Sequence, residues 1–153
     1  MPICIRSPAS IANLGPGFDV LSLAIQEPYD DVYVELSRGD DRVDFMGDYS
    51  HYLPNDYRAT TLYPVIEEFR RIAGIDFGVH IVVKKGIKPA SGLGSSGADA
   101  AALAYALNKL LNAGLDYKSL IRVAALGEIA AAGTPHMDNV AASLLGGLVI
   151  INQ

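Results

Sequence analysis

One segment of the sequence combines glycine, serine and a helix start in a way suited to binding phosphate. Residues 88–98 read Lys-Pro-Ala-Ser-Gly-Leu-Gly-Ser-Ser-Gly-Ala and lead from a β-rich run into an alanine-rich one. Gly92 and Gly94 can adopt positive φ and let the main chain approach a ligand closely. The first turn of the following helix offers unpaired N–H groups at the positive end of its dipole. The segment therefore predicts an anion site.

The same segment also has a plainer interpretation. Ser95 or Ser96 could be the N-cap of a helix, with the glycines making only a turn. A Walker-type P-loop is excluded, because no lysine follows Gly94 in the required position. The lysines at 84, 85 and 88 could serve a polyphosphate, or they could mark a solvated strand end. The choice depends on what else the chain contains.

Two more groups of polar residues lie further along the chain. Glu128 is the only charged residue between 124 and 132, where small residues surround it, and it could hold a cation or reach water from the edge of an apolar face. The run Thr134-Pro-His-Met-Asp-Asn139 places an imidazole, a carboxylate and an amide at a helix start. Capping accounts for Thr134 and Asp138 but leaves His136 and Asn139 without an explanation. His136 has no second His or Cys at ligand spacing, which argues against zinc.

A fourth feature lies near the beginning. Asn13 and Asp19 flank Leu14-Gly-Pro-Gly-Phe18, a loop that could bring both side chains to one pocket wall. Asn and Asp in loops are usually turn formers, so this segment alone favours a structural role. Four such features in one short chain favour function.

Composition limits the classes of protein to consider. The chain has 153 residues, half of them apolar, which suits one domain with its own core. The formal charge of −5 argues against a general nucleic-acid or membrane-surface role, which needs a basic face. The single cysteine, Cys4, cannot form an internal disulfide, and we expect it to pack in the core. We found no signal peptide and no long apolar run, so we expect a cytoplasmic protein.

The apolar pattern predicts strands first and helices later, which favours an α+β fold over an alternating βαβ sheet. A final apolar strand normally pairs with something further, so we expect half of a larger protein. The strands are expected at 3–6, 20–25, 32–36, 42–46, 79–83 and 148–151, and the helices at 60–73, 98–111, 116–132 and 134–145.

Taken together, three segments resemble the GHMP kinase superfamily and, within it, the homoserine kinases. They are residues 8–19, the glycine-serine loop at 91–97, and His136-Met-Asp-Asn139 before Leu144-Leu-Gly-Gly147. The resemblance implies the GHMP N-terminal domain, which is ribosomal protein S5 domain 2-like, with a mixed or antiparallel sheet packed against helices. Residues 1–153 would form the ATP-binding domain, and the C-terminal GHMP domain would be absent.

The resemblance implies transfer of the ATP γ-phosphoryl group to the side-chain hydroxyl of L-homoserine, with Mg²⁺ as a cofactor. The expected partners are ATP and L-homoserine, with no nucleic acid or membrane, and either a homodimer or a missing C-terminal half. Two alternatives stay open: another GHMP small-molecule kinase, or a non-catalytic nucleotide-binding fragment.

The family match also implies a role for each residue of the site. Asn139 would lie near the reacting hydroxyl and orient it, because an amide cannot take a proton. Ser96 and Glu128 would hold Mg²⁺, and Asn13, Asp19, His136 and Asp138 would face homoserine, with Asp19 suited to its ammonium group. The residues expected around the ATP phosphates are Lys88, Pro89, Ala90, Ser91, Gly92, Leu93, Gly94, Ser95, Ser96, Gly97 and Ala98.

Overall fold

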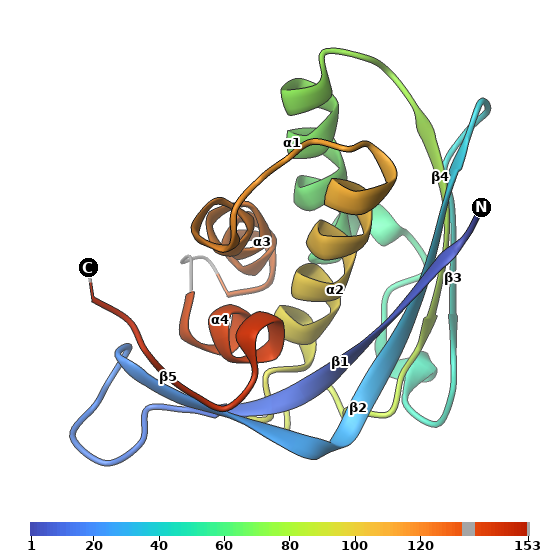
Figure 1. Ribbon diagram of the computed structural model, residues 1–153. Helices are drawn as coiled ribbons and strands as arrows, with labels where there is room; N and C mark the ends of the chain where they lie inside the picture. Colours follow the sequence, from blue (N-terminus) through green and yellow to red (C-terminus); the bar gives the residue numbers. More distant parts are fainter. Residues whose placement is uncertain (133–136, 153) are drawn as a thin grey trace.

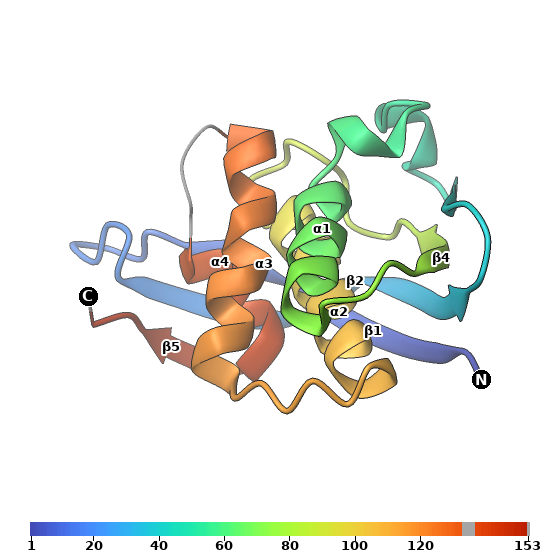
Figure 2. The ribbon, with the colours of Figure 1, turned by 90° about the horizontal axis from the view of Figure 1, so that it is seen from above.

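The structure, a computed structural model, describes residues 1–132 and 137–152 and has two layers. A twisted sheet forms one layer, and helices cover one of its faces (Figures 1 and 2). The strands are β1 (Ile3–Ala12), β2 (Leu21–Ser37), β3 (Arg42–Met46), β4 (Gly78–Lys84) and β5 (Leu148–Ile150). The helices are α1 (Leu62–Ala73), α2 (Ser95–Leu110), α3 (Tyr117–Ala132) and α4 (Met137–Leu145), with short 3₁₀ turns η1 (Ser50–Tyr52) and η2 (Tyr57–Ala59) before α1.

The sheet is mixed, in agreement with the α+β prediction. Its strand order is β1-β2-β4-β3, and β5 pairs with the beginning of β2. The β1–β2, β2–β4 and β2–β5 pairs are antiparallel, whereas β3 and β4 are parallel. Parallel neighbours need a crossover, and α1 supplies it. The chain therefore contains one βαβ unit that the strands-first pattern did not predict.

Strand β2 is a single long strand, where the sequence predicted two. Its partner β1 pairs Pro8 with Tyr29 but Ala9 with Ile25, so three residues of β2 are left opposite a register shift. A bulge of this kind bends a strand without ending it. The polar run that separated the two predicted strands contains this irregularity.

Alternation in the strands decides which side chains reach the core. In β4, Val79, Ile81 and Val83 are buried against the helices, whereas His80 and Lys84 are exposed on the outer face. His80 is thus an ordinary strand side chain on the solvent face of the sheet. The prediction for Cys4 was wrong: it is exposed, because it alternates with Ile3 and Ile5, which pack against the core.

The helix boundaries follow from local chemistry. Helix α1 tolerates Pro64 because the residue lies in its first turn, where no intrahelical N–H bond is needed, and Gly74 ends it with φ of 64°. Asp116 caps α3 by accepting the N–H of Ser119 at 2.9 Å. The predicted start of the last helix at Thr134 lies outside the described residues. Among the helices of the described chain, none has the length and apolarity that a membrane crossing needs.

Candidate functional site: a phosphate loop over a buried carboxylate

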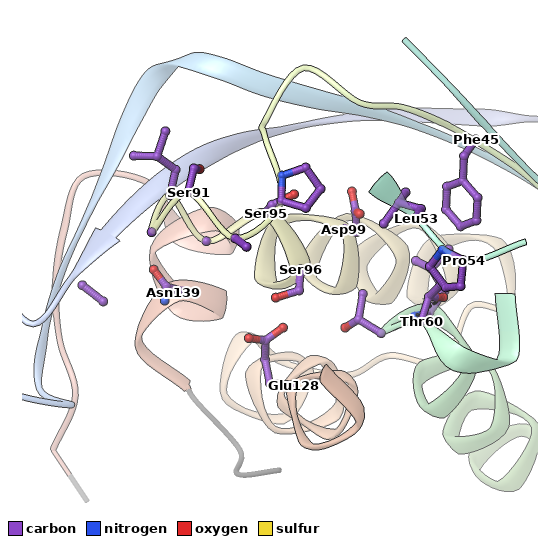
Figure 3. A pocket seen from close by; sticks show the side chains of 18 of the residues that line it. Phe45, Leu53, Pro54, Thr60, Ser91, Ser95, Ser96, Asp99, Glu128 and Asn139 are labelled. Carbon is purple, nitrogen blue, oxygen red and sulfur yellow. Dashed lines mark hydrogen bonds between the residues drawn. The ribbon is translucent and has the colours of Figure 1, made fainter. Parts of the chain in front are cut away.

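A cavity of about 510 Å³ opens where the glycine-serine loop meets helices α1, α2, α3 and α4 (Figure 3). Residues 89–96 form one wall, and Thr60 and Thr61 before α1, Glu128 of α3 and Asn139 of α4 contribute to the others. Of the residues predicted to surround phosphate, Gly97 and Ala98 are buried behind this wall in α2. Lys88 is exposed before it, with its ammonium 5.7 Å from the centre of the Tyr52 ring.

The loop turns through left-handed backbone conformations. The φ angles of Ala90, Gly92 and Gly94 are 58°, 78° and 65°. Helix α2 begins directly after Gly94, which is its N-cap and makes no side-chain capping bond. The alternative interpretation, in which Ser95 or Ser96 is the N-cap, was therefore wrong. Because Gly94 has no side chain, the amides of the first turn of α2 are not covered by a capping group and can meet an anion in the cavity.

A hydrogen bond from β1 and another across the base of the loop hold it in place, and the β1 residue also bonds α4. The N–H of Ser10 in β1 donates to the carbonyl of Leu93 at 3.0 Å, and its hydroxyl donates to Oδ1 of Asn139 at 2.8 Å. Ser95 Oγ donates to the carbonyl of Ile87 at 3.2 Å, across the base of the loop. A Cβ at Gly94 would collide with Ser10 Oγ and with the Asn139 amide, so only glycine fits this conformation and this space.

Glu128 is buried, with 5% of its surface exposed, so the interpretation in which it reaches water was wrong. It lies on α3 and points toward Ser96 of α2 across the cavity (Figure 3). The described residues contain no group of three or more His, Cys, Asp or Glu that could hold a metal. A nucleotide-bound Mg²⁺ does not require one, since phosphates supply most of its oxygens. A carboxylate and a hydroxyl are hard oxygen donors and fit that ion.

The residues predicted to face the acceptor substrate are only partly brought together. Asn13 lines the cavity, and its Oδ1 accepts the N–H of Asp19 at 2.8 Å, which makes the loop between them a closed turn. Asp138 is buried, and its carboxylate accepts the N–H of Asn139 at 2.8 Å at the start of α4. Its carbonyl accepts the Ser22 hydroxyl at 2.7 Å. His136 lies outside the described residues.

The lysine cluster before the loop divides into different roles. Lys84 is exposed on the outer face of the sheet, whereas the Lys85 side chain is completely buried. Its ammonium lies between the carboxylates of Asp30 and Asp99. Lys85 is therefore unavailable to a polyphosphate, which contradicts the interpretation that all three lysines could serve one. Sequence reasoning missed this group, because nothing in the spacing of residues 30, 85 and 99 marks them as neighbours.

Burial and charge act against each other in that group. Burial acts to lower the pKa of Lys85, but the carboxylates of Asp99 and Asp30 outweigh it, so the pKa lies above its usual value. Burial raises the pKa of Asp99 to about 7, with the Lys85 ammonium acting in the opposite direction. The three groups form a compact charged cluster beside the cavity, which Asp99 lines.

The far end of the cavity is apolar. Phe45 at the end of β3, Leu53 and Pro54 after η1, and Ala59 and Leu62 around the start of α1 line it. Sequence patterns did not indicate this end, because its residues lie in segments typical of ordinary turns and core. The cavity thus joins a polar, amide-rich end to an apolar end, which is the layout that a nucleotide requires.

Comparison with known proteins identifies the family of this domain. Residues 60–147, more than half of the chain, match the GHMP kinases N terminal domain. The chain belongs to the GHMP kinases. The glycine-serine loop lies within the matched region, as the resemblance implied.

The curated relatives carry the comparison further. The chain is 48% identical over 153 residues to homoserine kinase of Thermoplasma volcanium, covering 99% of this chain and 47% of that protein. It is 41% identical to homoserine kinase of Methanococcus maripaludis, covering 95% of this chain and 48% of the relative. The chain therefore spans about half the length of the curated relatives it matches.

Solved structures show the same fold. The crystal structure of homoserine kinase from Cytophaga hutchinsonii has a TM-score of 0.90 at 37% identity and covers 99% of this chain and 49% of that one. The L. major mevalonate kinase has a TM-score of 0.73 at 21% identity, covering 95% of this chain and 47% of that one, so it shows the fold alone.

Proposed function

We propose that this chain is the N-terminal, ATP-binding domain of a kinase that phosphorylates L-homoserine to O-phospho-L-homoserine. The observation that carries the proposal is the cavity itself: left-handed loop residues and an uncapped helix N-terminus face a buried carboxylate. Such a site attracts a polyphosphate together with its cation. The relatives named homoserine kinase support the choice of acceptor.

The two ends of the cavity suit different parts of ATP. The loop from Ser91 to Ser96 receives the phosphates, and the apolar end around Phe45 and Leu53 receives the adenine. Ser96 and Glu128 hold Mg²⁺, which neutralises phosphate charge when bound. In phosphoryl transfer the protein mainly positions the reactants and balances charge, because the transition state is loose and carries its charge on the peripheral oxygens.

The acceptor meets the γ-phosphate near Asn139. Its hydroxyl oxygen forms a bond to the γ-phosphorus as the bond from that phosphorus to the bridging oxygen breaks, and ADP leaves. The amide oxygen of Asn139 already accepts the hydrogen of Ser10, and an amide is no base at neutral pH. Asn139 therefore orients the nucleophile, and the hydroxyl proton passes to the phosphate being transferred. Asn13, Asp19, His136 and Asp138 contribute the homoserine side of the cleft.

Calorimetry tests the proposal directly. The chain is titrated with a non-hydrolysable ATP analogue and Mg²⁺, and the saturated complex is then titrated with L-homoserine and, separately, with R-mevalonate. We expect the analogue to bind and homoserine to bind in preference to mevalonate. Absence of nucleotide binding would overturn the proposal as a whole, and equal or better binding of mevalonate would overturn the choice of acceptor.

A further inference from the structure

The buried ammonium of Lys85 lies at the base of the phosphate loop, between groups from two separate elements. It donates to Asp30, which belongs to β2, and to Oδ2 of Asp99 in the second turn of α2 at 2.7 Å. The side chains of Lys85 and Asp30 are fully buried, and that of Asp99 is 4% exposed. The ammonium of Lys85, the residue directly after β4, thus joins β2 to the helix that follows the loop.

The chain entering the loop is fixed by the same group. Oδ1 of Asp30 accepts the N–H of Gly86 at 2.7 Å and that of Ile87 at 2.9 Å. A Cβ at Gly86 would collide with the carbonyl oxygen of Tyr29, so this part of the chain passes close against β2. The entry to the loop therefore has little freedom to move while Asp30 is held by Lys85.

The chain leaving the loop is tied back to the same place. Ser95 Oγ donates to the carbonyl of Ile87. One turn further along α2, Asp99 accepts a hydrogen bond from Lys85. Both ends of the segment from Lys88 to Gly94 therefore converge on one buried charge. The first turn of α2, whose backbone amides are proposed to bind the phosphates, begins at this junction.

We propose that Lys85, clamped by Asp30 and Asp99, is a positioning residue that sets the shape of the phosphate loop. We call these three residues the loop clamp. This inference rests on the proposed function, since it assigns the clamp to the loop that binds the nucleotide phosphates. Small displacements of a positioned group are costly in phosphoryl transfer, which depends on geometry more than on covalent chemistry.

The alternative is that the clamp is only a means of filling the core. A buried ion pair is a poor way to gain stability, because desolvation of the charges offsets their attraction. Apolar residues of similar volume often stabilise as well or better, whereas removing one partner leaves a buried charge uncompensated. A role in shaping the loop therefore predicts a change confined to the loop when Lys85 is replaced, whereas a role in general stability predicts a loss spread over the whole fold.

The test compares Lys85→Met with Lys84→Met in this chain. Lys84 is the adjacent residue, and its exposed side chain lies on the outer face, so the two variants lose the same charge. Calorimetry measures the affinity for inorganic tripolyphosphate, and amide hydrogen exchange compares residues 86–98 with Val79 to Val83. We expect Lys85→Met to bind about tenfold more weakly or worse than Lys84→Met. Its amides at 86–98 should exchange faster while those of β4 keep the parent rate.

The remaining outcomes would count against the positioning role of Lys85 or against the proposed function. Equal affinities of the two folded variants, or faster exchange spread equally over β4 and the loop, would overturn the positioning role. If Lys85→Met does not fold, Lys85→Met/Asp99→Leu replaces it in the same comparison, and failure of that double variant to fold would assign Lys85 to general stability. If the parent does not bind tripolyphosphate, the affinities are measured with the non-hydrolysable ATP analogue and Mg²⁺ instead; if the parent binds neither, the proposed function fails, and the exchange comparison alone decides whether the clamp shapes the loop.

Discussion

Replacing Gly94 with alanine tests how tightly the loop is built. An alanine in the left-handed region costs about 1–2 kcal/mol relative to glycine. Its Cβ would also displace the Ser10 hydroxyl from Asn139, and loss of that hydrogen bond costs about 1 kcal/mol. We therefore expect Gly94→Ala to lower the free energy of unfolding by about 2–3 kcal/mol. Since m-values in urea are about 1–3 kcal/mol/M for small proteins, the midpoint should fall by about 1 M or more.

Gly92 provides the matched control for this experiment. Its φ of 78° imposes the same kind of backbone cost, but a Cβ there would meet no atom within 4 Å. Gly92→Ala should therefore lose only the backbone contribution, about 1–2 kcal/mol. Far-UV circular dichroism can follow the urea unfolding, since the chain has no tryptophan. Equal losses for the two variants would refute the account in which the contact among Gly94, Ser10 and Asn139 fixes the loop.

Three further predictions concern charge and chemistry. Glu128→Gln should weaken binding of an ATP analogue about tenfold when Mg²⁺ is present and leave Mg²⁺-free binding almost unchanged, as measured by calorimetry; equal losses in both conditions would contradict a metal role. The pKa of Asp99 is raised, so between about pH 4 and about pH 7 the folded chain holds a proton that the unfolded chain has released. The free energy of unfolding therefore falls as pH rises through that window. Asp99→Asn should flatten this dependence in urea unfolding, by at most about 4 kcal/mol between the two pH values, and an unchanged slope would show that other groups carry it. Asn139→Ala should reduce phosphoryl transfer to L-homoserine without abolishing it, and complete loss with substrate binding intact would mean that Asn139 does more than orient the hydroxyl.

Local patterns predicted the parts of the fold that depend on neighbouring residues. Alternation in β4, the αL end of α1 at Gly74 and the Asp116 cap of α3 each involve groups a few residues apart, and these elements lie where the sequence predicted a strand at 79–83 and helices at 60–73 and 116–132. The glycine-serine loop was recognisable for the same reason. The N-cap residue of α2 could not be recognised from the sequence, because contacts with Ser10 of β1 and Asn139 of α4 are what require glycine at position 94.

The features that the sequence did not predict depend on contacts between residues far apart in the chain. The loop clamp joins residues 30, 85 and 99, and only the sheet register brings β2 to the end of β4. Cys4 looked apolar by its neighbours, but the pairing of β1 with β2 turned its side chain outward. The burial of Glu128 depends on how α3 packs on α2, which its own helix pattern left undecided.

We propose that the loop from Ser91 to Ser96 binds the phosphates of ATP. Amide chemical shifts of the isotopically labelled chain, recorded during addition of a non-hydrolysable ATP analogue with Mg²⁺, test it most directly. We predict that the largest changes fall on the loop and the first turn of α2, with further changes at Glu128 and around Phe45. Shifts centred on another face of the molecule, with the loop amides unchanged at saturation, would contradict the claim.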